Sequence, residues 1–155
     1  MENLAELMLF GADRAQHVAE VIRPALAEGR IVLCDRFSQA TMAYQGFGRG
    51  LCRETVDAVD KAARGEVRPD LIVLLDLPVE AGLARVRKRN FRGSDLSETR
   101  IDEEELSFHQ RVREGYLQIA REDPERHFIL DARRPSVELS KVVISEMSAR
   151  FPHAL

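Results

Sequence analysis

Asp35 and Arg36 place a carboxylate and a guanidinium side by side at the end of an apolar run. A guanidinium can hold a phosphate through two parallel hydrogen bonds. The neighbouring carboxylate can accept a hydroxyl proton, or bind a hydrated Mg²⁺ ion directly or through a water. We therefore interpret the pair as a candidate phosphate site, with a purely structural ion pair as the alternative.

Phe10 and Arg14 form a second candidate pair. They lie four residues apart in a segment, 2–22, that predicts a helix, so they share one face of it. That face is about 100° from the predicted apolar stripe. A Phe one turn from an Arg could support a base and offer a hydrogen-bond donor beside it, although a Phe packed under a neighbouring helix is the alternative. The predicted stripe consists of Leu4, Met8, Gly11, Ala15, Val18 and Ile22.

Three apolar runs, 31–35, 71–77 and 127–131, predict buried strands because none of them alternates with polar residues. Helical segments lie between and after them, at 53–64, 78–89, 103–121 and 136–149. Alternating strands and helices predict an α/β fold with a parallel sheet, here one domain over 1–155. The runs carry Asp35, Asp76 and Asp131 toward the ligand edge of that sheet. For Asp76 and Asp131, capping of the following helix is the alternative.

The segment 85–105 is too charged to be core, because it begins with basic residues and ends with acidic ones. It predicts either a solvated loop or, over 89–105, a lid whose arginines close over an anionic ligand. We expect no nucleic-acid partner, because the basic cluster 85–92 is short and is balanced by Asp95, Glu98 and the acidic run 103–105.

Composition narrows the remaining classes. The formal net charge is -3, and 45% of the 155 residues are hydrophobic, which suits one domain with a real core. No apolar stretch approaches the ~18 residues of a transmembrane helix, and the amino terminus does not resemble a signal peptide. The two cysteines lack metal-ligand spacing, and Cys34 is predicted to be a small core residue. We expect a cytoplasmic protein without a membrane partner.

The order of several motifs resembles the thymidylate kinases. The resemblance rests on FGADRAQH (10–17), DRF (35–37) and AYQG (43–46), and continues through RPDLIVLLDLPVEAGLARVRKR, FHQRVREGYLQIA and FILDA. It implies an α/β, P-loop nucleoside monophosphate kinase-like three-layer sandwich. It also implies a dTMP kinase (EC 2.7.4.9), a transferase that moves the γ-phosphoryl of ATP to dTMP, giving dTDP and ADP for dTTP biosynthesis. Mg²⁺ and a homodimer belong to the same expectation.

The resemblance also implies an acceptor site. Phe10 would stack on thymine, Arg14 would reach its O4 edge, and Thr41 and Gln45 would contact the base. Tyr44 would lie against the sugar and disfavour a 2′-hydroxyl. Asp35 would support Mg²⁺, and Arg36 would hold the dTMP phosphate and the group in transfer. One departure is Phe37, where Tyr or His is more usual.

On the ATP side, the resemblance implies that Arg89 and Ala132 border adenine. It makes Arg100 the catalytic lid arginine that approaches the ATP phosphates. The family pattern usually has an acidic residue before this arginine, whereas this chain has Thr99. Arg92 is therefore the competing candidate for that role.

One expected motif is absent from these 155 residues. The pattern G-x-x-x-x-G-K-[ST] cradles nucleotide phosphates, but none of Lys61, Lys88 and Lys141 follows a glycine-rich turn. We expect the first strand or strands and this loop to be missing from the chain, leaving unpaired strand edges and a marginal or rearranged sheet. We therefore expect the chain alone to be inactive. The alternatives are a non-catalytic nucleotide-binding remnant and another nucleoside monophosphate kinase.

Overall fold

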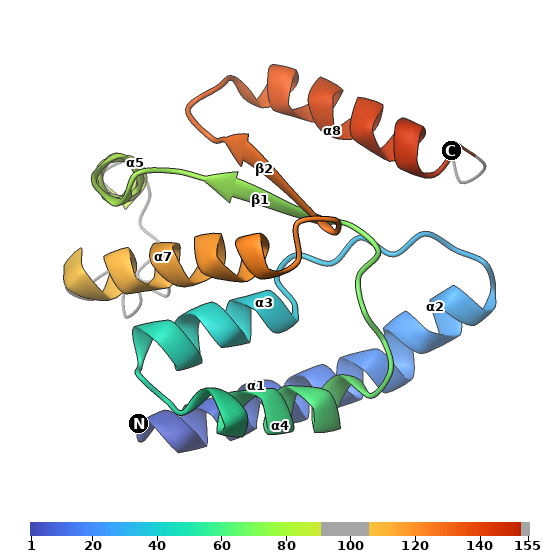
Figure 1. Cartoon of the computed structure of the whole chain (residues 1–155), viewed down its shortest axis with the longest axis vertical. Helices are drawn as coiled ribbons and strands as arrows, with labels where there is room; N and C mark the ends of the chain where they lie inside the picture. Colours follow the sequence, from blue (N-terminus) through green and yellow to red (C-terminus); the bar gives the residue numbers. More distant parts are fainter. Residues whose placement is uncertain (91–105, 153–155) are drawn as a thin grey trace.

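The structure, a computed structural model, describes residues 1–90 and 106–152 and combines many helices with a short parallel sheet (Figure 1). The regular elements up to Arg64 are all helical, and the two strands of the described residues come after them. In chain order the elements are α1 (Asn3–His17), η1 (Val18–Ile22), α2 (Arg23–Ala27), α3 (Ser38–Thr41), η2 (Met42–Gly48), α4 (Arg53–Arg64), β1 (Ile72–Asp76), α5 (Val79–Asn90), α7 (Leu106–Glu122), β2 (His127–Asp131) and α8 (Ser136–Arg150).

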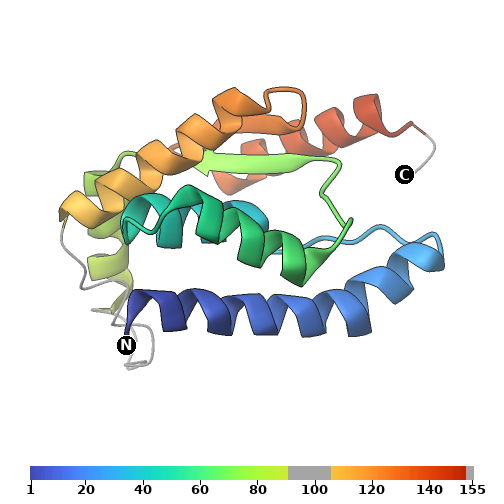
Figure 2. The same ribbon diagram turned by 60° about the horizontal axis from the view of Figure 1, so that its bottom comes forward.

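The two strands pair in parallel, which confirms the predicted α/β class. The register runs from Ile72 opposite His127 to Asp76 opposite Asp131, so the two carboxylates end neighbouring strands. One side of the sheet faces α7, and α8 lies on the other side (Figure 1). Beyond α7 lie η2 and then the pair α1 and α4, which form the base of the molecule (Figure 2).

Helices α1, η1 and α2 continue one another as a long rod that packs along α4 (Figure 2). Its buried positions include Gly11, Val18 and Ile22, as expected, but also Leu7. Leu4 and Met8 belong to the same predicted stripe but are 43% and 50% exposed. The contact is set at Gly11, where an added Cβ would lie 2.8 Å from Val59 Cγ1. This close approach of α4 determines which face of α1 is buried.

A second close contact joins η2 to α7. A Cβ at Gly48 would lie 2.7 Å from the ring of Phe108, and one at Gly115 would lie 2.6 Å from the ring of Phe47. Each glycine thus admits an aromatic ring from the opposite helix. This contact helps to fix the position of η2, which carries several of the residues predicted to bind a ligand.

The segment 31–35 is not a strand, so this prediction was wrong. Its residues have no regular structure, and within the described residues the sheet has the order β1-β2. Val32 packs against the cluster of Val18, Ile22 and Phe37, but Leu33 is 83% exposed. An isolated extended segment has no ladder of hydrogen bonds to hold it. Cys34 is exposed as well, so the prediction that it is a core residue was also wrong.

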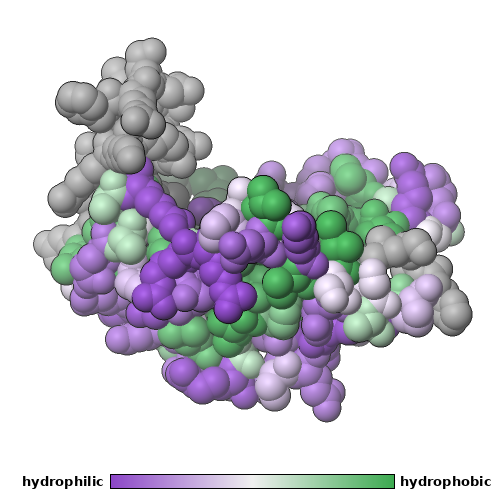
Figure 3. All heavy atoms as spheres, turned by 90° about the horizontal axis from the view of Figure 1, so that it is seen from above, coloured by the Kyte–Doolittle hydropathy of each residue, from purple (hydrophilic) through white to green (hydrophobic). Residues whose placement is uncertain are grey.

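The face that bears α8 and the sheet presents apolar side chains among polar ones (Figure 3). Exposed apolar residues on these elements include Leu75, Ile129, Val137 and Ile144. Among the described residues, no helix combines the length and the apolar character needed to span a bilayer.

Candidate active site

A cavity of about 230 Å³ lies between α1 and the segment that runs from Asp35 through η2. Asp35 lines it together with every residue that the sequence predicted for the acceptor. Those residues are Phe10, Arg14, Arg36, Thr41, Tyr44 and Gln45. Residues from two separate stretches of the chain therefore meet around one space.

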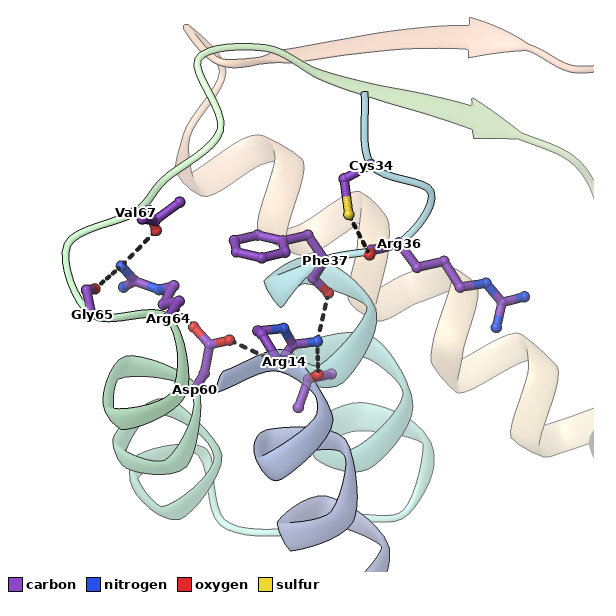
Figure 4. A network of polar contacts seen from close by, with 9 residues as sticks. Arg14, Cys34, Arg36, Phe37, Asp60, Arg64, Gly65 and Val67 are labelled. Atoms are coloured by element: carbon purple, nitrogen blue, oxygen red, sulfur yellow. Dashed lines mark hydrogen bonds and ion pairs between the residues drawn. The ribbon is translucent and has the colours of Figure 1, made fainter. Parts of the chain in front are cut away.

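Arg36 enters the cavity wall from a left-handed backbone conformation, with φ of 65°. The Cys34 thiol donates a hydrogen bond of 3.3 Å to the carbonyl of Arg36 and closes this turn. The left-handed region is costly for a residue with a Cβ, and such strain concentrates at functional sites. The Arg36 side chain extends away from Arg14 (Figure 4), and its Cζ lies 5.4 Å from the centroid of the Tyr44 ring.

Arg14 lies on the packed side of α1, and not on a separate face as expected. Its side chain is only 10% exposed. The Nη1 atom donates to Oδ1 of Asp60 at 3.1 Å, while Nη2 donates to the carbonyl of Phe37 at 3.1 Å and to Oγ1 of Thr41 at 2.7 Å (Figure 4). These bonds join α1 to α4 and to both ends of α3, and they hold the guanidinium in one orientation.

Burial lowers the pKa of Arg14, because desolvation disfavours its charged form, and the charge of Asp60 opposes this effect. An arginine stays protonated at any ordinary pH despite such a shift. The guanidinium is therefore a fixed cation and a donor of hydrogen bonds, with no capacity to accept one. A ligand group that faces Arg14 must be an acceptor.

Phe10 stands on α1 one turn before Arg14 and is 45% exposed. Its ring thus lines the cavity without being buried under a neighbouring helix, which was the alternative for this residue. An accessible ring at the wall of a cavity is suited to stacking on a flat ligand.

Thr41 and Gln45 are nearly fully buried, and their polar groups bond to other cavity residues. Thr41 accepts from Arg14, and Gln45 Nε2 donates to Oε1 of Glu6 at 2.9 Å. Glu6 also accepts from Nε of Arg49 at 3.3 Å. Glu6 thus orients the Gln45 amide. The contacts of Thr41 and Gln45 with a base remain predictions.

An aromatic wall stands beside Arg36. The ring of Tyr44 lies edge-on to Phe108, with 6.1 Å between centroids, and to Tyr116, with 6.3 Å. Burial, as the largest cause, raises the pKa of Tyr116 to about 12, so its phenol stays neutral. This packing holds the Tyr44 ring at the cavity wall.

The sequence interpretation missed several lining residues. Glu6, Asp13 and His17 project from the same helix as Phe10 and Arg14, at intervals of three and four residues. Helical spacing from those two residues could have identified all three. Phe37, the last residue of the DRF motif, lines the other side with Ala40 and Arg49, and the sequence positions of Ala40 and Arg49 carry no comparable signal.

The other two strand-end carboxylates form ion pairs and do not line the cavity. Both oxygens of Asp76 accept from Arg113, at 2.7 and 2.9 Å, and this bonding lowers the pKa of Asp76. Asp131 accepts hydrogen bonds from Arg133. The bond from the Arg133 guanidinium is the largest cause of the lowered pKa of Asp131, which is about 2. Neither observation supports capping of a helix, the alternative for both residues.

The predicted ATP-side residues are only partly described. Ala132 follows β2; its N–H donates to the carbonyl of Asp76 at 2.8 Å, and its carbonyl accepts from Nη2 of Arg85 at 3.0 Å. Arg89 belongs to α5, but its side chain is outside the described part of the chain, as are Arg92, Arg100 and most of the predicted lid.

The sequence of this chain is similar to those of known proteins. A family model described as Thymidylate kinase matches residues 1–143. The thymidylate kinase of Trichlorobacter lovleyi is 52% identical over 148 residues, covering 96% of this chain and 70% of that protein. The thymidylate kinase of Desulfovibrio desulfuricans is 57% identical over 132 residues, covering 84% of this chain and 61% of that protein.

A solved structure supports the same assignment. The crystal structure of thymidylate kinase from Ehrlichia chaffeensis superposes with a TM-score of 0.67 and 29% identity, covering 93% of this chain and 66% of that one. The aligned regions span about three fifths to two thirds of the length of two of these three proteins. The chain belongs to the thymidylate kinase family.

Proposed function

We propose that the cavity binds dTMP as the acceptor nucleotide of a thymidylate kinase reaction. The observation that carries this proposal is that every residue predicted for the acceptor lines one cavity. The names of the relatives support the substrate, since proteins 52% and 57% identical to this chain are called thymidylate kinase.

In this proposal the base lies between Phe10 and Arg14. The exposed Phe10 ring stacks on thymine, and Arg14 donates to the O4 oxygen, which is an acceptor. Thr41 and Gln45 border the base, with the Gln45 amide oriented by Glu6. Tyr44, held by its aromatic neighbours, lies against the sugar and leaves too little room for a 2′-hydroxyl.

The phosphate of dTMP is held by Arg36. Its guanidinium can form paired hydrogen bonds to phosphate oxygens. The guanidinium lies over the ring of Tyr44, the residue proposed for the sugar, so it stands on the side of the cavity where the sugar and phosphate would lie. Asp35, an exposed carboxylate beside it, offers the hard oxygen that Mg²⁺ prefers, directly or through a water. When bound, that ion would neutralise phosphate charge.

We propose that residues 1–155 form one domain. We also propose ATP as the phosphoryl donor. Phosphoryl transfer needs alignment of the acceptor oxygen, the phosphorus and the leaving oxygen, with cationic groups to stabilise the charge. Arg36 meets this need on the acceptor side. Arg100, Arg89 and Ala132 remain the proposed donor-side residues, with the segment 89–105 as the lid that excludes water.

The donor side limits what these residues do alone. No G-x-x-x-x-G-K-[ST] pattern occurs in the 155 residues, so they contain no loop of that type for the ATP phosphates. We propose that the family reaction, which yields dTDP for dTTP synthesis, requires such a loop. We expect the chain by itself to bind dTMP without turning it over.

We also propose a cytoplasmic homodimer formed through α1. One face of this helix is apolar and accessible: Leu4 is 43% exposed, Met8 is 50% exposed, and Ala12 continues the same face one turn on. A second copy would bury this face in both chains. Light scattering tests this proposal, because Met8→Lys should convert a dimer to a monomer, and a wild-type monomer would refute it.

Calorimetric titration tests the acceptor proposal. dTMP should bind more tightly than dUMP, CMP or thymidine, because thymidine lacks the phosphate and CMP has an amine where thymine has O4. If dTMP and ATP give heat of binding but no ADP is released, the result would agree with an acceptor site next to an incomplete donor site. Equal affinity for CMP and dTMP would instead favour another nucleoside monophosphate kinase, and no binding would refute the proposal.

A further inference from the structure

Asp60, on α4, lies outside the cavity but bonds directly to Arg14, which lines it. Asp60 is 5% exposed, so its carboxylate has little contact with water. Its Oδ1 accepts from Nη1 of Arg14 at 3.1 Å, and its Oδ2 accepts from Nε of Arg64 at 2.8 Å (Figure 4). A buried carboxylate between two guanidinium groups is held on both sides and has little freedom to turn.

Arg64 is itself anchored at the end of α4. Its Nη1 donates to the carbonyls of Gly65 at 2.9 Å and Val67 at 3.3 Å. Gly65 has φ of 60° and ψ of -132°, a backbone conformation that strongly favours glycine. The turn after α4 thus fixes Arg64, Arg64 fixes Asp60, and Asp60 fixes one edge of the Arg14 guanidinium.

We infer that Asp60 is a positioning residue for the acceptor base, setting the orientation in which Arg14 meets a ligand carbonyl. The inference deepens the proposed function and rests on it. Asp60 on α4 accepts a hydrogen bond from Nη1, while Phe37 and Thr41, at the two ends of α3, accept from Nη2, so three protein groups define the plane of the guanidinium. The donors of Arg14 that remain available then have a set direction relative to Phe10.

The consequence is selectivity for the atom at position 4 of the base. A correctly oriented guanidinium donates a hydrogen bond to an oxygen there. It disfavours an amine, which is also a donor. A residue that only stabilises the fold would affect all ligands of the cavity alike. A positioning residue affects dTMP more than an analogue whose base offers no acceptor at that position.

The test compares two ligands on purified 155-residue chains. The ligands are dTMP and 5-methyl-dCMP, which keeps the methyl group, sugar and phosphate but carries an amine in place of O4. The variants are Asp60→Asn, Arg14→Met and the double variant. Glu122→Gln is the matched control, because it removes a carboxylate that bonds to another α4 arginine, Arg53, and neither residue lines the cavity.

We expect Asp60→Asn to weaken dTMP binding roughly tenfold, the size of one charge-assisted hydrogen bond. Binding of 5-methyl-dCMP should change little. The dissociation constant for 5-methyl-dCMP divided by that for dTMP should therefore fall toward the value found for Arg14→Met. Glu122→Gln should leave both constants unchanged. An equal loss for both ligands, or no loss of dTMP binding, would overturn the inference.

The double variant covers the case in which Asp60→Asn does not fold. Arg14→Met leaves Asp60 bonded to Arg64, and the double variant removes both members of the Arg14–Asp60 pair. If Asp60 acts through Arg14, these two variants bind dTMP equally; a further loss in the double variant overturns the inference. Failure of the wild-type chain to bind dTMP overturns the proposed function itself, and it is seen before any variant is compared.

Discussion

The guanidinium of Arg36 lies over the ring of Tyr44, with 5.4 Å between Cζ and the ring centroid. This contact is made from a left-handed residue, so the backbone turn and the aromatic wall together determine where the charge stands. The strained backbone of Arg36 thus fixes the position of its side chain, and mutations can measure the cost of that strain.

Arg36→Gly tests that trade-off. Without the guanidinium, dTMP affinity should fall at least tenfold. Without a Cβ the turn is relaxed, so the free energy of unfolding should be about 1 kcal/mol higher than that of Arg36→Ala, which lacks the guanidinium but keeps the strain. Calorimetry and chemical denaturation give the two values. Equal stability of the Gly and Ala variants would show that the turn stores no strain.

Tyr44→Ala tests the proposed discrimination between sugars. We expect the variant to bind the ribose form of TMP nearly as well as dTMP, because the ring no longer fills the space beside the 2′ position. Loss of contacts with Phe108 and Tyr116 should also cost about 3 kcal/mol of stability. Tyr44→Phe is the control and should keep the discrimination. Unchanged preference for dTMP in Tyr44→Ala would remove Tyr44 from the sugar site.

Gly115→Ala tests the contact of α7 with η2. The added Cβ would lie 2.6 to 2.8 Å from three atoms of Phe47, so this ring must move, and we expect a loss of about 1–3 kcal/mol in the free energy of unfolding. Gly46→Ala is the matched control in η2, where an added Cβ would meet nothing within 4 Å. Thermal denaturation should separate the two variants; similar melting temperatures would contradict the packing described.

The ion pair of Arg53 and Glu122 predicts a pH dependence of stability. The bond from Arg53 lowers the pKa of Glu122 to about 2, below its ordinary value. A depressed pKa in the folded state means that the stabilisation is present above about pH 4.5 and is lost as the pH falls toward 2. The pair is largely exposed, so the effect should be small and sensitive to salt.

Denaturation curves of wild type and Glu122→Gln between pH 2 and 7 measure this effect. The difference in their free energies of unfolding should be constant above about pH 4.5 and shrink below it, because both side chains are then neutral. A difference that does not change with pH would show that the pair contributes nothing through charge.

Elements with strong local signals were predicted closely. The helix Arg53–Arg64 and the strand His127–Asp131 have the bounds read from the sequence. The segment 31–35 has an equally strong apolar pattern, yet it forms no strand here. A strand depends on a neighbour for its hydrogen bonds, and an apolar pattern does not show whether that neighbour is present.

The candidate site was predictable where chemistry follows chain spacing. Phe10, Arg14, Asp35 and Arg36 were identified from their residue types and positions, and Thr41, Tyr44 and Gln45 from the family resemblance. Asp60 and Arg64 were not, because a carboxylate on an amphipathic helix looks like any solvated charge. Only the packing of α4 against α1 turns Asp60 inward, against Arg14.

A crystal structure of the 155-residue chain with dTMP is the most direct test of the account. It should show thymine against Phe10, its O4 within hydrogen-bonding distance of the Arg14 guanidinium, and the phosphate bonded to Arg36. The account would be contradicted by dTMP bound elsewhere, such as at the strand ends beside Asp76 and Asp131, with the cavity between α1 and η2 left empty.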